Sequence, residues 1–379
     1  MNKKLKVLPV LAMGLMLVAC NGGTSSSSKP TSKNDDVNFT LKVGSYVALG
    51  SNPNQIEVST AAVILKGEKI VDAYFDVLQA PFKIDSTTDK KTEKVTFTVS
   101  LDTTKNQTKD AGDKVIETKQ ELKERYAMKE NTEDAQKMEW YNQANNFAKY
   151  TVGKTIDEVT SKNYKSHYNK DGAVEVPGCT ISQTNFTTAL KVITDTKTFK
   201  APAGKVSAGL GYKVSALSKD NVLTVTLAGS ATDKDGKIYE TSINAYQIPV
   251  TVDGTKVTEP KIAIDTTKTQ TKAENFKGHT VESEANKYYT SVLSKRELKE
   301  LYAMKENTED AQKMEWYNQA NNFAKYAKGK IASEIAGKSY KSNHNPDGTV
   351  EVPGCTITME DFAVAIGKSA TNKSGLTAK

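Results

Sequence analysis

One segment of this chain occurs twice in nearly identical form, and this repetition limits the folds that the chain can adopt. The thirty residues ELKERYAMKENTEDAQKMEWYNQANNFAKY, which begin at Glu121, return from Glu297 with a single difference, Arg125 against Leu301. The two copies are offset by 176 residues, which is far longer than the unit of a solenoid. The sequence therefore predicts a duplicated domain.

Each copy has the same order of sequence patterns. Strand-like alternation of Thr, Val, Ile and Tyr comes first, in FTLKVGSYVAL, IEVSTAAVIL, IVDAYFDVLQ and KVTFTVSL, and again in KVSALS, VLTVTLAG and IYETSINAYQIPVTV. Turn signals such as LKGEK and DKDGK separate these runs, which favours antiparallel hairpins. A helical pattern follows, with one apolar face made of Met138, Tyr141, Ala144 and Ala148, widened by Trp140 and Phe147. We expect an α+β fold of two tandem homologous domains, each an antiparallel sheet followed by helices.

The first twenty residues have the pattern of an export signal. The basic stretch MNKKLK precedes VLPVLAMGLMLVA, an apolar run of signal-peptide length that is followed directly by Cys20. The ending LVAC resembles the bacterial lipoprotein box, in which the cysteine is acylated after cleavage; the alternative is an ordinary secretory signal. We expect residues 1–19 to be a lipoprotein signal peptide and Cys20 to be the lipidation site. The chain would then be lipid-anchored at the extracytoplasmic face of the cell membrane.

The remaining boundaries follow from composition. Residues 20–36 are rich in Ser, Gly, Thr and Lys, which predicts a flexible tether after the lipid anchor. The two domains are predicted at residues 37–197 and 203–372, because TKTFKAPAG interrupts the strand pattern between them. The formal charge of +7 becomes +4 once the three lysines of the signal are removed, and it is spread evenly. This argues against nucleic acid as a partner.

The phrase EVPGCTI, at residues 175–181 and 351–357, contains two of the three cysteines. A helical pattern follows each copy, with Ser182 and Thr358 in position to be N-caps. Thr180 and Thr356 would then lie two residues before a helix start, where free N–H groups favour an anion. Gly178 and Gly354 would leave room for a ligand against the backbone or for a tight turn.

The phrase EVPGCTI also has other interpretations. Three cysteines and three scattered histidines provide no set of metal ligands. A cysteine nucleophile would lack a repeated partner, because His167 aligns with Asn343 and His344 with Tyr168. A disulfide between Cys179 and Cys355 is compatible with secretion. The simplest alternative is a Pro-Gly turn followed by a small buried hydrophobic residue, which we favour for the cysteine alone.

Gly-Cys-Thr-Ile-Ser and Gly-Cys-Thr-Ile-Thr resemble the motif of FMN-binding domains that carry flavin covalently. The lipoprotein signal, the ELK-x-x-Y-x-MK phrase, the MEWYNQA phrase and the two motif copies are together similar to FMN-binding, pheromone-precursor-type lipoproteins of extracellular electron transfer. The resemblance covers nearly the whole mature chain.

The resemblance implies a site and partners. A flavin transferase would esterify the FMN phosphate onto the central threonine of each motif, giving two covalent FMN groups. The implied cofactor-binding residues are Thr180, Gly178, Cys179, Ile181 and Ser182, and Thr356, Gly354, Cys355, Ile357 and Thr358. Electrons would arrive from a membrane NADH dehydrogenase through quinone and leave to an extracellular acceptor. The chain would be an electron-transfer flavoprotein and a substrate of the transferase, not itself a catalyst.

Two alternatives to this function remain. The chain could be a non-redox surface binding or structural lipoprotein in which the motif is only a turn and a helix cap. The cleaved signal peptide could in addition yield a peptide pheromone, as the family resemblance allows. For Trp140 and Trp316, shielding of a flavin ring competes with the apolar face of a core helix, which we favour.

Overall fold

The computed structural model of this chain describes residues 36–52, 54–104, 116–131, 137–164, 174–253, 260–266, 292–305, 314–341 and 351–375. The predicted signal peptide, Cys20 and nearly all of the predicted tether lie outside the described residues, as do His167 and His344.

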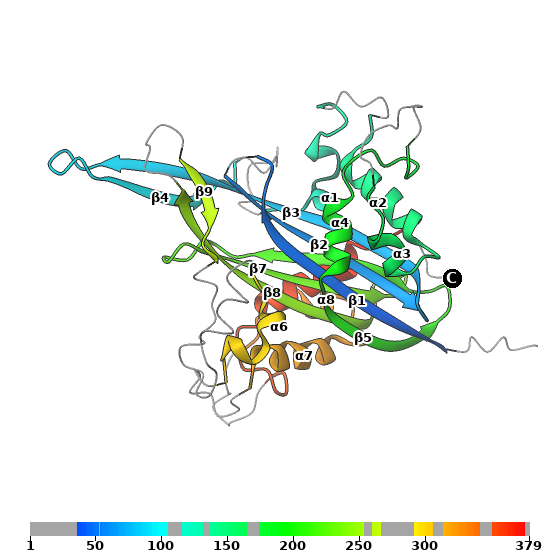
Figure 1. The fold of residues 1–379 in the computed structure, drawn as a ribbon. Helices are drawn as coiled ribbons and strands as arrows, with labels where there is room; N and C mark the ends of the chain where they lie inside the picture. The colour runs from blue at the N-terminus through cyan, green and yellow to red at the C-terminus, as the bar shows by residue number, and fades with distance from the viewer. Residues whose placement is uncertain are drawn as a thin grey trace, which may run out of the picture. The chain divides into compact units, whose positions relative to one another are not determined.

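The described strands form two antiparallel sheets, as the hairpin pattern predicted (Figure 1). The first sheet has the order β4-β3-β2-β1-β5 and the second the order β6-β7-β8-β9. Their bounds are β1 Asp36–Leu49, β2 Gln55–Lys66, β3 Lys69–Thr88, β4 Val95–Leu101, β5 Ile193–Pro202, β6 Ser207–Val214, β7 Val222–Thr232, β8 Ile238–Asp253 and β9 Lys261–Ile264.

Short helices follow the strands in each half of the chain. Their bounds are α1 Lys119–Leu122, η1 Lys123–Tyr126, α2 Trp140–Thr151, α3 Ile156–Thr160, α4 Thr184–Lys191, α6 Lys295–Leu298, η4 Lys299–Tyr302, α7 Trp316–Ala327, α8 Ala332–Ile335 and α9 Glu360–Thr371. The mixed α+β class is therefore confirmed, whereas the homology of the two halves as separate domains stays a prediction.

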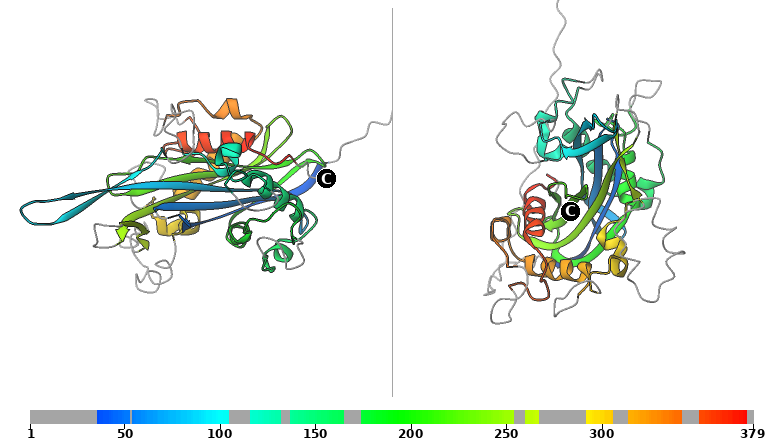
Figure 2. Two further views of the ribbon diagram at one scale, coloured as in Figure 1. Left: turned by 90° about the horizontal axis from the view of Figure 1, so that it is seen from above. Right: turned by 90° about the vertical axis from the view of Figure 1, so that its left-hand side faces the viewer.

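The two sheets pack face to face, and helices cover their outer faces. One hydrophobic cluster contains residues of both sheets, including Phe39 and Ile64 from the first and Tyr212 and Leu227 from the second. Helices α2 and α4 pack on the outer face of the first sheet, and α7 and α9 pack on the second. The right-hand view of Figure 2 shows the red α9 and the green helices on opposite sides of the strands. The two halves of the chain consequently share a core within one compact unit.

This arrangement explains why the alternation in the strands is incomplete. In β2, Ala62 and Ile64 face the other sheet, while Ala61, Val63 and Leu65 pack against helices. Both faces of the strand are apolar because both are buried. A strand with one solvent-exposed face would instead alternate apolar and polar residues.

Two expectations about the strands are wrong. The segment TKTFKAPAG does not interrupt the strand pattern, because residues 193–202 form β5 and pair with β1 from Asp36↔Pro202 to Gly44↔Ile193. The segment KVSALS is not the first strand of the second half, because β6 begins at Ser207 and ends at Val214. Pairing with the distant strand β1 decides the conformation of β5, whereas β6 pairs with β7, the next strand in the chain, from Ser207↔Thr232 to Val214↔Val225.

The predicted helix is also shorter than its pattern suggested. Helix α2 begins at Trp140, so Met138 precedes it, and Tyr141 is only half-buried. Trp140 is 4% exposed and packs edge-on against Phe186, with ring centroids 5.7 Å apart. Trp316 is 3% exposed and contacts Phe362 in the same way. The tryptophans are core residues, as we favoured.

Candidate functional site

The phrase Val-Pro-Gly-Cys folds into a tight turn in both halves. The Cys179 N–H donates to the Val176 carbonyl at 3.0 Å, and Cys355 repeats this bond to Val352 at 2.9 Å. Gly178 has a φ of +71°, the left-handed conformation that glycine adopts at little cost. Of the two roles considered for the glycine, the structure supports the tight turn.

An asparagine of α2 holds the first turn in place, and an asparagine of α7 holds the second. Asn146 donates from Nδ2 to the Gly178 carbonyl at 2.9 Å, and Asn322 does so to Gly354 at 2.8 Å. A Cβ added to Gly178 would lie only 2.3 Å from Asn146 Nδ2. The space beside the glycine is therefore filled by the asparagine amide.

The central threonine is bound to a glutamine of the same helix. Gln143 Oε1 accepts from the Thr180 N–H at 2.7 Å, from the Thr180 hydroxyl at 3.0 Å and from the Ile181 N–H at 3.1 Å. Gln319 makes the same three bonds to Thr356 and Ile357, at 2.8, 3.2 and 3.2 Å. In each half, three donors thus converge on one acceptor oxygen.

The same glutamine is fixed at its other end. Gln143 donates from Nε2 to the Met138 carbonyl at 3.2 Å, and Gln319 repeats this to Met314 at 3.2 Å. Gln143 is 2% exposed. A fully buried amide in this position orients the acceptor oxygen toward the threonine, so the donor cluster is built into the fold.

The predicted helix start is wrong by one residue. Helix α4 begins at Thr184 with Gln183 as its N-cap residue, and α9 begins at Glu360 with Met359 in that place. Neither of these residues makes a side-chain capping bond. Ser182 and Thr358 are exposed and precede the caps, so the threonines lie one residue farther from the helix than expected.

The structure brings the other predicted residues together around the turn. Thr180 and Thr356 are 2% and 3% exposed. Ile181 and Ile357 are half-buried and pack against the hydrophobic clusters that contain residues of α2 and of α7, respectively. The Ser182 hydroxyl donates to the Thr184 hydroxyl at 3.1 Å. The motif is thus exposed at its two ends, Pro177 and Ser182, and buried at the cysteine and threonine in its middle.

The cysteines behave as small buried residues. Cys179 and Cys355 are both free, which excludes the disulfide between them, and they are 2% and 0% exposed. Burial raises the pKa of the Cys179 thiol to about 11 and that of Cys355 to about 12. Gln183 donates to the Cys179 sulfur at 3.2 Å, which opposes part of this rise. Neither thiol has the properties of a nucleophile.

We therefore expect both thiols to resist alkylation in the folded protein. At pH 8 a thiol with such a raised pKa is far less than about 1% thiolate, and the thiolate is the reactive form. Iodoacetamide should modify Cys179 and Cys355 only after denaturation, as measured by peptide mass spectrometry. Rapid alkylation of either residue in the native protein would show that the turn opens readily.

The sequence did not identify Gln143, Gln319, Asn146 and Asn322 as site residues. The signal was present, because Gln143 lies on the buried face of α2 among the apolar residues Trp140 and Phe147. A buried amide requires partners, and this requirement indicates a specific polar contact.

No group of three or more potential metal ligands occurs in the part of the chain that the structure describes. No described helix combines the length and the apolar character that crossing a membrane requires. Comparison with protein-family models, with curated proteins and with solved structures gives no match.

Proposed function

We propose that this chain is a lipid-anchored, extracytoplasmic electron carrier that holds FMN through phosphoester bonds to Thr180 and Thr356. The observation that supports this proposal most is the converging set of donors in each half. The threonine hydroxyl, its own N–H and the following N–H all point at one oxygen, the glutamine Oε1. In a phosphoester the hydroxyl oxygen becomes the bridging atom, and the two N–H groups that remain suit a phosphate oxygen as well as that of an amide.

The described residues fit a phosphate ester at this hydroxyl. Thr180 supplies the attachment atom, and the N–H groups of Thr180 and Ile181 are positioned to donate to phosphate oxygens once Gln143 moves away. Gln143 can turn its amide to another partner, because glutamine is both donor and acceptor. Bound FMN would supply the electron transfer, while the protein binds and orients it.

The burial of the hydroxyl has a consequence for attachment. Thr180 and Thr356 are almost fully buried. A transferase can therefore reach their hydroxyl groups only after the hydrogen bonds to Gln143 and Gln319 have broken and the turn has moved away. Pro177 and Pro353 are exposed at the outer side of the turn, where an enzyme could engage the segment. Attachment therefore requires local opening of residues 174–183 and 351–359, or takes place before folding is complete.

The partners in this proposal are those that the family resemblance implies. They are a flavin transferase, a membrane NADH dehydrogenase with quinone, and an extracellular acceptor. The chain itself would be a carrier and not an enzyme. The two homologous domains, at residues 37–197 and 203–372, would each carry one flavin.

The burial of the threonines also favours a second candidate function, a non-redox binding or structural lipoprotein. In that case the hydroxyl, satisfied by Gln143, only stabilises the turn. The two candidates differ in one simple property, because only the carrier contains flavin.

We expect protein produced with an active flavin transferase to keep flavin absorbance after denaturation and gel filtration. Thr180→Ala or Thr356→Ala should each remove about half of the flavin, and the double variant all of it. Thr187→Ala, which changes a buried hydroxyl outside the motif in α4, is the matched control and should retain full absorbance. Flavin that persists in the double variant would reject these attachment sites.

A further inference from the structure

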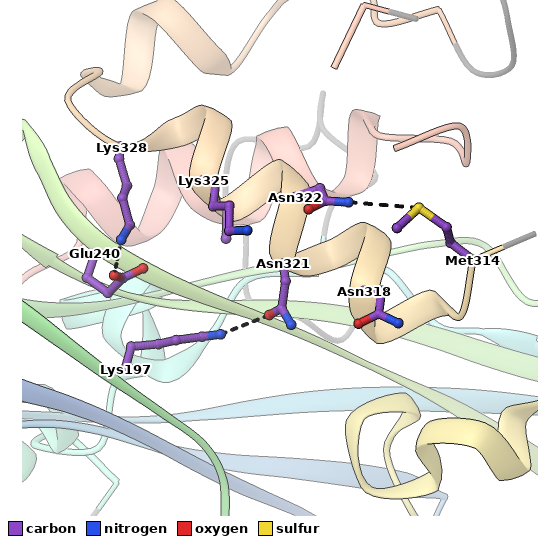
Figure 3. A pocket seen from close by; sticks show the side chains of 9 residues that line it. Lys197, Glu240, Met314, Asn318, Asn321, Asn322, Lys325 and Lys328 are labelled. Carbon is purple, nitrogen blue, oxygen red and sulfur yellow. Dashed lines mark hydrogen bonds and ion pairs between the residues drawn. The ribbon is translucent and has the colours of Figure 1, made fainter. Parts of the chain in front are cut away.

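A second polar feature lies beside the turn of the second half. Figure 3 shows a pocket between β5, β8 and helix α7, with a volume of about 280 Å³. Among its lining residues are Lys197, Lys325 and Lys328, with Asn321 and Glu240. The pocket therefore contains three ammonium groups and one carboxylate, an excess of two positive charges in one depression.

The ammonium group of Lys197 is held in position by its partners. Lys197 donates to Asn321 Oδ1 at 2.9 Å and lies 3.6 Å from Asp195 Oδ2, with a side chain only 24% exposed. Arg296 donates to the same Asn321 oxygen at 2.9 Å. With its oxygen occupied by two cationic donors, Asn321 has only its amide N–H groups left to offer a ligand in the pocket.

The other two lysines differ in their partners. Lys328 forms an ion pair with Glu240, whose side chain is 5% exposed. Lys325 Nζ has no acceptor among the described residues, although it lines the same depression (Figure 3). Glu240 therefore neutralises Lys328. Asp195 is shared between Lys197 and Arg296. One of the charges on this last pair and the charge of Lys325 are left without a carboxylate among the described residues, so a bound anion would relieve their repulsion.

The size and lining indicate what kind of anion fits. About 280 Å³ is close to the lower end of small-molecule sites, about 300 Å³, so the pocket holds more than a bare ion. Lysine binds phosphate as a point charge, and asparagine amides bind hydroxyl groups. Asn318 and Asn322 line the pocket as well.

We propose that this pocket binds a small phosphorylated, hydroxyl-rich molecule, of the size of a pentose phosphate, with Lys197, Lys325 and Lys328 around the phosphate. The site is separate from the covalent attachment proposed above and does not depend on it. Asn322 connects the two, because it lines the pocket and also holds the Gly354 carbonyl.

The repeat provides a matched control for this proposal. Lys149, the residue 176 positions before Lys325, is also exposed near the end of its helix. Val152 stands in the first half where the second has Lys328. The first half thus keeps one of these lysines but lacks the other, so its helix does not offer the same concentration of charge.

The test is equilibrium binding of ribose 5-phosphate to the full chain, purified from a host without a flavin transferase, at low salt. We expect saturable binding at one site, competition by inorganic phosphate and no binding of ribose. Lys325→Gln should weaken binding about tenfold or more, since a hydrogen bond to a charged group is lost. Lys149→Gln should leave binding unchanged.

Two results would overturn the proposal. One is the absence of saturable binding of both ribose 5-phosphate and inorganic phosphate to the wild-type chain. The other is equal weakening by Lys325→Gln and Lys149→Gln, which would mean that only the general charge of the protein attracts the anion. Because the protein contains no flavin in this experiment, the outcome is independent of the proposed carrier function.

Discussion

Replacing Asp76 with asparagine is expected to make the protein more stable at pH 8 and to remove much of the pH dependence of its stability. Asp76 lies in β3 and is 1% exposed. Burial raises its pKa to about 8, and the charge of Glu121 adds to this rise. Hydrogen bonds from Thr118 and from the N–H groups of Gln120 and Val77 lower it in part.

The sign of the pH effect follows from the raised pKa. The folded protein holds the Asp76 proton more tightly than the unfolded chain, in which the pKa is about 4. The stability contribution of Asp76 is therefore fully present below about pH 4 and is lost as the pH rises to about 8. Between these pH values the free energy of unfolding falls by about 5 kcal/mol because of Asp76. Asparagine does not ionise, so the variant does not lose this free energy.

The second half of the chain has an asparagine, Asn244, at the position that corresponds to Asp76. Asn244 Oδ1 accepts from the N–H groups of Ala245 and Arg296 at 2.8 and 3.3 Å. These bonds match those from Val77 and Gln120 to Asp76 Oδ1, at 2.8 and 3.1 Å. Asparagine can therefore replace the aspartate without loss of the acceptor.

Urea unfolding of wild type and Asp76→Asn from pH 4 to 8 measures the effect. The variant should keep a smaller decline, because burial also raises the pKa of Asp72, to about 7. Asp85→Asn, at an exposed position of the same strand, should behave as wild type. A variant with the full pH dependence of the wild type would show that Asp76 is ionised normally in the fold.

Replacing Gln143 with leucine is expected to lower the free energy of unfolding by about 3 kcal/mol, because three buried donors would lose their acceptor. The donors are the N–H and hydroxyl of Thr180 and the N–H of Ile181. Leucine is apolar and of similar size, so the loss is of polar partners more than of packing. Gln319→Leu should have a similar effect in the second half.

Unmodified protein from a host without a flavin transferase is the right material for this measurement. Asn142→Ala, a half-buried position next to Gln143 in α2, is the control and should cost under about 1 kcal/mol. A loss for Gln143→Leu as small as that of the control would mean that water replaces the glutamine oxygen at no cost. The N–H and hydroxyl of Thr180 and the N–H of Ile181 would then be accessible to water in the folded protein.

Local patterns in the sequence were sufficient to predict part of the fold. The turn segments LKGEK and DKDGK do join antiparallel strands, with Gly67 and Gly236 at positive φ. The apolar face of α2 around Ala144 and Phe147 is buried as its spacing predicted. These features depend on residues close together in the chain, so their signals are local.

The features that the sequence did not predict depend on distant contacts. Strand β5 pairs with β1 as far as Pro202, although the Pro and Gly of TKTFKAPAG taken alone indicate a break. The incomplete alternation in β2 results from burial on both faces, and a single sequence does not say what covers the second face. Likewise the role of Gln143 depends on a contact 37 residues away.

The central claim is that Thr180 and Thr356 each carry FMN through a phosphoester, and intact mass spectrometry tests it most directly. The mature protein would be purified from a membrane with an active flavin transferase and denatured before measurement. We expect two increments of FMN minus water, one lost in each single Thr→Ala variant and both retained in Thr187→Ala. No increment in the wild-type protein, from cells in which the transferase modifies another substrate, would contradict the carrier function.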